Sequence, residues 1–160
     1  MITAYISIGT NIEREYHLKA GLDAVKKLAS QWRMSRVFEA EPVGFSGDNF
    51  FNAVIEIQTL LPLTALQAQL KKIERQLGRP EHAVKNQSRT IDLDLLLYGD
   101  VVSTELPLLP RSDIYRFAFV LWPLSELSPE LVIPKETQTL AQLWHNFSQQ
   151  QELWPVEFVI

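Results

Sequence analysis

The order of its hydrophobic patterns constrains the fold of this chain more than any other feature. Four segments show the two-residue alternation of a β-strand, and two show the three- and four-residue spacing of an amphipathic helix. The order β-α-β-β-α-β is typical of a ferredoxin-like α+β fold, an antiparallel sheet with both helices on one face. The strands are predicted at residues 2–8, 32–38, 50–59 and within 88–99, and the helices at 13–30 and from Pro62 to Gly78.

Proline punctuates the chain after Gly99, where the alternation of strands and helices ends. The segment around Pro107 and Pro110 is predicted to be extended, and a short helix is predicted at 117–124. A last short helix is predicted at 140–147, and residues 154–160 are predicted to add an edge strand. No repeat, low-complexity tract or linker divides the sequence, so we expect one domain over residues 1–160.

Charge and cysteine content exclude several classes of protein. The 15 basic and 19 acidic residues give a net charge of -4, which argues against a large basic surface for nucleic acid. The absence of cysteine excludes disulfides, thiolate catalysis and Cys-ligated zinc. No apolar run reaches the roughly 18 residues of a membrane span, and the first residues lack the pattern of a signal peptide. These observations favour a cytoplasmic enzyme or binding domain that acts on small molecules.

Two carboxylates lie on one face of the fourth predicted strand. Asp92 and Asp94 are two residues apart, so they project together with Cα atoms roughly 7 Å apart, while Leu93 and Leu95 project into a core. Such hard oxygen ligands suit Mg²⁺, and a pair of these ions can clamp a phosphoryl displacement. Arg89 lies three residues before Asp92 and has the fork that binds a phosphate oxygen. The Asp-x-Asp pattern is short, and taken alone it favours a strand end with solvated carboxylates.

Two loops and one amide add to this pattern. Residues 79–88 have no apolar periodicity and lead into the Asp-x-Asp strand, as expected either for a lid or for a solvated connection. Residues 41–48 contain one proline and two glycines, and the phenylalanines in and beside this loop either sandwich a flat heterocycle or belong to the core. Asn52 lies inside an apolar strand, where both its donor and its acceptor need partners.

Five longer motifs connect these features: EPVG (41–44), FNAV (51–54), ERQLGR (74–79), RTIDLDLLLYG (89–99) and FVLWPL (119–124). Together they resemble the 6-hydroxymethyl-7,8-dihydropterin pyrophosphokinase family of folate biosynthesis, from about residue 4 to about residue 134. The Arg-Thr-x-Asp-x-Asp motif with the upstream Gly-Arg is the most specific part of the resemblance. It implies the same ferredoxin-like fold, and the transfer of a pyrophosphoryl group from ATP to the hydroxymethyl group of a reduced pterin, which leaves AMP.

The resemblance also implies a role for each matching position. Asp92 and Asp94 would hold two Mg²⁺ ions that bridge the ATP phosphates, and Arg79 and Arg89 would neutralise phosphate charge. Four positions match the pterin pocket, and five match the nucleotide site. The pterin positions are Val43, Phe50, Asn52 and Phe119, and the nucleotide positions are Glu74, Arg89, Leu95, Arg111 and Ser112.

The chain departs from the family pattern at four positions. Thr10 replaces a serine, and Asn86 stands where many members have a tryptophan. Arg111 replaces a histidine, and Phe117 takes the place of an arginine, with Arg116 one residue away. We expect Arg111, rather than Arg116, to contact the ATP phosphates. The alternatives are a divergent member with weak activity or a shifted substrate, and a non-catalytic module that binds a pterin or a nucleotide.

Overall fold

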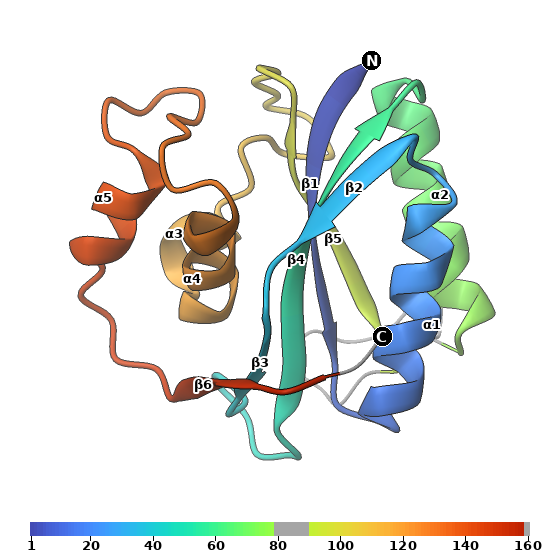
Figure 1. Ribbon diagram of the computed structural model, residues 1–160, viewed down its shortest axis with the longest axis vertical. Coiled ribbons are helices and arrows are strands. Elements are labelled where there is room, and N and C mark those ends of the chain that lie inside the picture. The colour runs from blue at the N-terminus through green and yellow to red at the C-terminus, as the bar shows by residue number, and fades with distance from the viewer. Residues whose placement is uncertain (79–89, 159–160) are drawn as a thin grey trace.

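The computed structural model describes residues 1–78 and 90–158, with a six-stranded sheet at its centre (Figure 1). All of its strand pairs are antiparallel. The strand order is β5-β1-β4-β3-β6, and β2 also pairs with β4. The predicted α+β fold with an antiparallel sheet is therefore confirmed. The strands are β1 (Ile2–Thr10), β2 (Gln31–Met34), β3 (Val37–Ala40), β4 (Phe50–Thr59), β5 (Asp92–Tyr98) and β6 (Leu153–Val156).

Two helices, α1 (Arg14–Lys26) and α2 (Leu63–Gln76), cover one face of the sheet, on the right in Figure 1. Every second residue of β1 and β4 is buried beneath them, as the sequence alternation predicts. α1 ends earlier than predicted, and Pro62 is the N-cap of α2 rather than its first residue. α2 ends just before Gly78, whose φ of 97° favours glycine. This layer contains Ala4, Ile6, Ile8, Ala53, Ile55 and Ile57 from the sheet and Leu18, Leu22, Leu66 and Leu70 from the helices.

Three shorter helices cover the opposite face, on the left in Figure 1. They are α3 (Asp113–Arg116), α4 (Ala118–Leu127) and α5 (Leu140–His145). They pack on sheet residues that point away from α1 and α2, such as Val54 and Leu96. The helices predicted at 117–124 and 140–147 agree with α4 and α5, and β6 lies beside β3 at the edge of the sheet.

The single strand predicted at 32–38 is wrong, because two strands, β2 and β3, occupy this region. Both pair with β4, and Ser35 lies in the break between them. The Ser35 backbone N–H donates to the Val54 carbonyl at 2.9 Å, and its hydroxyl accepts from the Val54 N–H at 2.9 Å. A serine side chain therefore replaces a backbone acceptor at the break, which residue alternation does not reveal.

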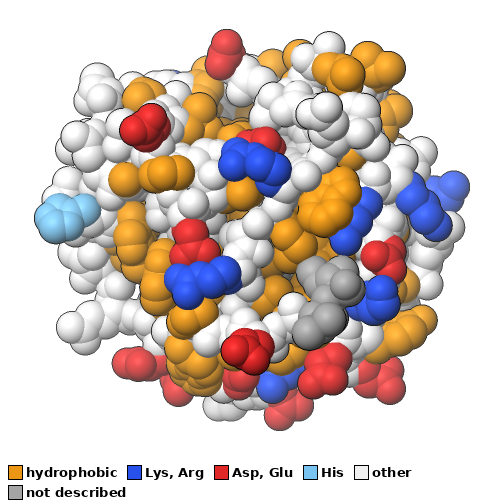
Figure 2. Space-filling view, viewed as in Figure 1, with side chains coloured by type: hydrophobic (Ala, Val, Ile, Leu, Met, Phe, Trp, Pro, Cys, Tyr) orange, Lys and Arg blue, Asp and Glu red, His pale blue; other side chains and the backbone are white. Residues whose placement is uncertain are grey.

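Charges of both signs share the molecular surface. On the face seen in Figure 2, basic and acidic side chains are interspersed, with several acidic groups along the lower edge. This distribution accords with the net charge of -4. Within residues 1–78 and 90–158, no helix has both the length and the apolar character needed to cross a bilayer.

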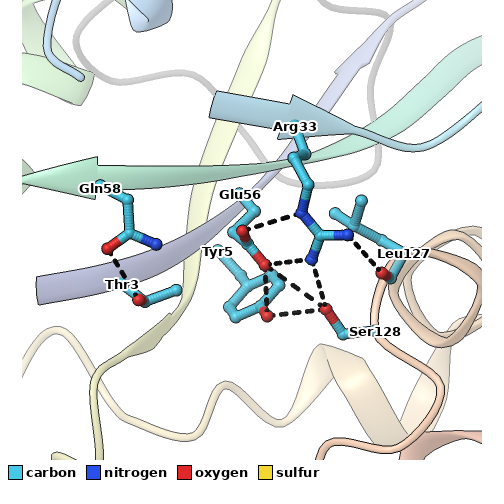
Figure 3. Close-up of polar contacts among 7 residues, drawn as sticks. All are labelled: Thr3, Tyr5, Arg33, Glu56, Gln58, Leu127 and Ser128. Atoms are coloured by element: carbon cyan, nitrogen blue, oxygen red, sulfur yellow. Dashed lines mark hydrogen bonds and ion pairs between the residues drawn. The ribbon is translucent and has the colours of Figure 1, made fainter. Parts of the chain in front are cut away.

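A polar cluster of Tyr5, Arg33, Glu56 and Ser128 joins the sheet to the second layer, which consists of α3, α4 and α5 (Figure 3). The Glu56 carboxylate accepts from Arg33 Nη2 at 2.6 Å, from Arg33 Nε at 3.1 Å and from the Tyr5 hydroxyl at 2.7 Å. Burial raises the pKa of Tyr5 to about 12, which keeps this hydroxyl protonated. Arg33 also donates to the Leu127 carbonyl at 3.3 Å and to the Ser128 hydroxyl at 3.3 Å. The cluster therefore fastens the C-terminal end of α4 to three strands of the sheet.

Replacing Glu56 with Gln is expected to lower the free energy of unfolding by about 1–3 kcal/mol at neutral pH, because a charged hydrogen-bond acceptor is lost. The hydrogen bonds from Arg33 are the main cause that lowers the pKa of Glu56 below its ordinary value. A lowered pKa stabilises the fold above the unfolded-state pKa, and this contribution disappears as pH falls through the folded-state pKa. The difference between the variant and the parent in chemical denaturation should therefore shrink below about pH 4.

The matched control is Glu126→Gln, because Glu126 forms a similar 2.6 Å ion pair with Arg36 on the exposed surface. Exposed pairs contribute about 0–1 kcal/mol, so this variant should unfold much like the parent. Equal destabilisation by the two variants would show that the Figure 3 cluster is no more important than an ordinary surface pair.

Candidate active site

Three strand ends meet at the lower end of the sheet in Figure 1, where β1 stops and where β4 and β5 start. Gly9 of β1 is paired with Asn52 of β4 on one side and with Asp92 of β5 on the other. Asp94 is paired with Ser7, two residues along the same face. The strand register therefore brings the two carboxylates and the amide onto one face of the sheet, the face that carries α3 and α4.

The carboxylate pair lies in surroundings that disfavour two negative charges. The Asp94 side chain is only 18% exposed. Burial is the main cause that raises the pKa of Asp94, to about 7, and the neighbouring Asp92 raises it further. Arg111 acts in the opposite direction. Near neutral pH the pair consequently needs a positive partner to be fully ionised.

Arg111 supplies one such partner. Its Nη2 lies 3.5 Å from Asp94 Oδ1, and its Nε donates to Asp113 Oδ2 at 3.0 Å. The backbone N–H of Arg111 donates to the Leu96 carbonyl at 3.0 Å, which fixes the start of this side chain beside β5. The predicted phosphate ligand thus lies directly against a predicted metal ligand.

Asn52 presents an unused hydrogen-bond donor. The residue is 5% exposed, and its Nδ2 is buried without a hydrogen-bond partner among the described residues. On the other side of the amide, a Cβ atom added to Gly9 would lie 2.8 Å from Asn52 Oδ1. Gly9 therefore leaves the space that the Asn52 amide occupies. Buried donors in native proteins normally have a partner, so this amide is suited to bind a ligand acceptor.

Two half-buried aromatic rings lie on the elements that border this amide. Phe50 starts β4 and meets Phe45 edge to face, with ring centroids 6.1 Å apart. Phe119 lies in the first turn of α4 and stacks on Phe117, with centroids 4.9 Å apart and an interplanar angle of 22°. Val43 is half-buried in the loop before β4. Phe117, which departs from the family pattern, thus packs against the ring of Phe119, a predicted pterin-binding residue.

The loop that leads into β4 is held from the α1 side. Asn11 Nδ2 donates to the Asp48 carbonyl at 3.1 Å, and Arg14 Nη1 donates to the Asn49 carbonyl at 3.1 Å. Asn49 Nδ2 in turn donates to Glu39 Oε2 at 3.0 Å. These contacts border a cavity of about 790 Å³ and fix the backbone immediately before Phe50.

Three further predicted residues have different surroundings. Glu74 is buried, and its Oε2 accepts from the Leu93 backbone N–H at 2.7 Å, so it binds the outer edge of β5. Leu95 is 2% exposed and belongs to the layer under α1 and α2, so its side chain points away from the Asp94 face. Ser112 is exposed and is the N-cap residue of α3.

Arg79 and Arg89, together with Asn86, lie outside the described residues. The described chain stops at Gly78 and resumes at Thr90. These two residues are neighbours, since a Cβ atom on Gly78 would lie 3.7 Å from Thr90 Cγ2.

The donor set fits a hard cation that takes few protein ligands. Among the described residues, no group of three or more His, Cys, Asp or Glu side chains is placed to hold a metal ion. Asp92 and Asp94 thus offer two carboxylates, the number that Mg²⁺ commonly takes when substrate phosphates and water complete its shell.

Comparison with known proteins places the chain in a family. A family model described as 7,8-dihydro-6-hydroxymethylpterin-pyrophosphokinase (HPPK) matches residues 5–129. The chain belongs to the HPPK family. It is 33% identical over 153 residues to a 2-amino-4-hydroxy-6-hydroxymethyldihydropteridine pyrophosphokinase of Haemophilus influenzae, covering 92% of this chain and 94% of that protein. A protein of the same name from Bacillus subtilis is 34% identical over 133 residues, covering 80% of this chain and 79% of the relative.

Solved structures show the same fold. A crystal structure of wild-type HPPK-DHPS from Plasmodium falciparum, with SDX-DHP, superimposes with a TM-score of 0.71 at 13% sequence identity. The match covers 92% of this chain, which spans 44% of the length of that one.

Sequence reasoning missed two contributions to this HPPK-family site. The position of Gly9 opposite Asn52 follows only once β1 and β4 are paired in register, and no pattern within either strand indicates it. The support of the loop by Arg14 and Glu39 joins α1 to the end of β3, and no local pattern indicates it.

Proposed function

We propose that this chain transfers a pyrophosphoryl group from ATP to the hydroxymethyl group of 6-hydroxymethyl-7,8-dihydropterin, giving AMP and the pterin diphosphate. Family membership supports this reaction. The structural observation that carries it is the pairing of Gly9 with Asn52 on one side and with Asp92 on the other. This register places the buried Asn52 donor and the carboxylate pair on one face of the sheet.

The pterin binds between the rings of Phe50 and Phe119, with Val43 closing the pocket. A flat bicyclic ring has two faces to bury and polar atoms along its edge, so it needs both aromatic walls and hydrogen-bonding groups. The Asn52 Nδ2 group provides a donor for that edge, and the Asn52 carbonyl oxygen provides an acceptor.

Asp92 and Asp94 hold Mg²⁺, two ions in our proposal. When bound, these ions neutralise phosphate charge and orient the ATP phosphates. The two carboxylates share one face of β5, so they present their oxygens to the same space. The second layer restricts water around Asp94, which strengthens its interaction with any cation.

The remaining assigned residues bind the nucleotide. Arg79, Arg89 and Arg111 neutralise the phosphates, and Ser112 lies at the start of α3 beside Arg111. Glu74 lies at the outer edge of β5, where a nucleotide can lie alongside the strand, and Leu95 contributes through its backbone because its side chain is buried.

Identification of the adenine nucleotide that is released from ATP tests the reaction. The chain is incubated with Mg²⁺, ATP and the reduced hydroxymethyl pterin, and nucleotides are separated by ion-exchange chromatography. AMP formed in equal amount to the pterin diphosphate is expected. ADP would indicate an ordinary kinase, and tight pterin binding without turnover would indicate a non-catalytic binding module.

Replacing Gly9 with Ala is expected to weaken pterin binding, because the added methyl group requires the Asn52 amide to move. The loss should approach that of Asn52→Ala, about 1–3 kcal/mol or roughly 5–150-fold in the KM for pterin. The KM for ATP should change little in both variants. Gly47→Ala is the matched control, because Gly47 is exposed in the loop before β4. Unchanged pterin affinity in Gly9→Ala and Asn52→Ala would place the pocket elsewhere.

A further inference from the structure

Among the described residues, Arg111 is both a predicted phosphate ligand and a direct contact of a predicted metal ligand. Its guanidinium joins Asp94 at 3.5 Å to Asp113 at 3.0 Å. The ion pair lies in a partly buried position, since the side chains of Arg111 and Asp94 are 33% and 18% exposed. Pairs at such positions are screened less than pairs on the open surface.

We propose that Arg111 is an internal counter-cation that competes with divalent metal ions for Asp94, so that metal binding and nucleotide binding to this protein are coupled through the position of one guanidinium. This inference rests on the proposed function, because it takes Asp94 as a metal ligand. It adds that the protein without nucleotide binds divalent cations weakly because Arg111 occupies Asp94.

Competition follows from the charges and their distance. The Asp94 side chain is only 18% exposed and shares its strand face with Asp92, so a cation close to its carboxylate oxygens stabilises the negative charge there. The Arg111 guanidinium now supplies that cation. A divalent cation bound to the same oxygen would lie close to the positive guanidinium, and the repulsion between the two cations opposes their simultaneous binding.

The departure of the guanidinium from Asp94 leaves the other contacts of Arg111 in place. The backbone N–H of Arg111 donates to the Leu96 carbonyl, and its Nε donates to Asp113 Oδ2. Only the outer part of the side chain has to rotate, and it keeps Asp113 as a partner. The negative charge of a nucleotide triphosphate offers the displaced guanidinium a second partner with the bidentate geometry that arginine favours. Nucleotide should therefore draw Arg111 away from Asp94 and increase the affinity of the site for metal.

The test measures Mn²⁺ alone, by electron paramagnetic resonance of the free ion, in protein without nucleotide. Arg111→Gln should bind Mn²⁺ at least about tenfold more tightly than the parent, which corresponds to about 1.4 kcal/mol. Arg111→His should change in the same direction and guards against a folding defect in the first variant. Adding a non-hydrolysable ATP analogue should raise the Mn²⁺ affinity of the parent by a larger factor than that of Arg111→Gln.

Arg116→Gln is the control for the change in net charge. Arg116 is exposed, with its guanidinium 5.0 Å from the Phe117 ring, and within the described residues it has no ion pair with a carboxylate. Its Mn²⁺ affinity should stay within about twofold of the parent. Equal or weaker Mn²⁺ binding by both Arg111 variants, or an equal gain in Arg116→Gln, would overturn the proposal. The AMP assay on the parent is independent of this result, so failure of the counter-cation and failure of the proposed reaction are distinguishable.

Discussion

Replacing Asp92 or Asp94 with Asn should lower AMP formation by roughly 10³-fold or more while the fold survives. Each carboxylate projects from the site face of β5, whereas the strand is anchored by Ile91, Leu93 and Leu95 on the other face. Loss of either carboxylate would remove one of the two proposed metal ligands and leave a single negative charge to hold Mg²⁺. Steady-state turnover at limiting and saturating Mg²⁺ is the measurement.

The stability of the Asp94 variant provides a second, independent readout. Because the folded-state pKa of Asp94 is raised, to about 7, its ionisation weakens the fold as pH rises from the unfolded-state pKa through the folded-state pKa. Asp94→Asn should therefore unfold at the same or slightly higher denaturant concentration than the parent at pH 8. The control is Asp23→Asn, on the exposed side of α1. Near-parental turnover in either site variant would contradict the metal assignment, and unfolding of both would make the carboxylates structural.

Replacing Arg89 with Ala should reduce kcat/KM by roughly 10²–10³-fold, the usual cost of about 2.7–4 kcal/mol for losing a preorganised charge donor at a transferring phosphate. Arg89 directly precedes Thr90 and lies three residues before Asp92, the first residue of β5. Thr90 is held in place because its carbonyl accepts a hydrogen bond from the Thr10 hydroxyl at the end of β1. Arg79→Ala should show a similar or smaller loss.

Arg36→Ala supplies a matched loss of one arginine, since the guanidinium of Arg36 pairs with Glu126 on the surface. Its kcat/KM should equal that of the parent. A change of less than about threefold for Arg89→Ala would remove Arg89 from the reaction, because that is below the effect of even one weak charged contact. Measurement of kcat and of the KM for ATP separately shows whether the charge acts on binding or on the transition state.

Much of the fold was predictable because strand and helix periodicities are local. The order of elements, the facing of Asp92 and Asp94 away from Leu93, and the end of α2 near Gly78 all follow from spacing within a few residues. The break at Ser35 was not predictable, since it depends on one hydroxyl that replaces a backbone carbonyl as the acceptor for the Val54 N–H of β4. The packing of α3, α4 and α5 on the second face depends on contacts distant in sequence, where Val54 and Leu96 of the sheet are buried.

The site divides in the same way. Residues in one strand, such as Asp92 and Asp94, were placed together by their spacing alone. Contacts between residues that are far apart in the sequence were not predictable from it. Gly9 opposite Asn52 depends on strand register, and Arg111 against Asp94 depends on how the chain returns to β5 after Pro110. The resemblance to a family implied a nucleotide-binding role for Arg111, and the structure shows that this residue contacts Asp94.

The second layer has a consequence for how activity is assembled. Phe119 stands in the first turn of α4, and the ten-residue helix, roughly 15 Å long, ends at the Arg33–Glu56–Tyr5–Ser128 fastening. The strand register alone aligns the carboxylates and the amide, whereas the proposed aromatic wall also requires α4 to be packed on the sheet. Pterin turnover should therefore depend on how firmly α4 packs on the sheet. If the contacts at the C-terminal end of α4 are weakened, we expect selectivity for the pterin ring to fall before the sheet itself unfolds.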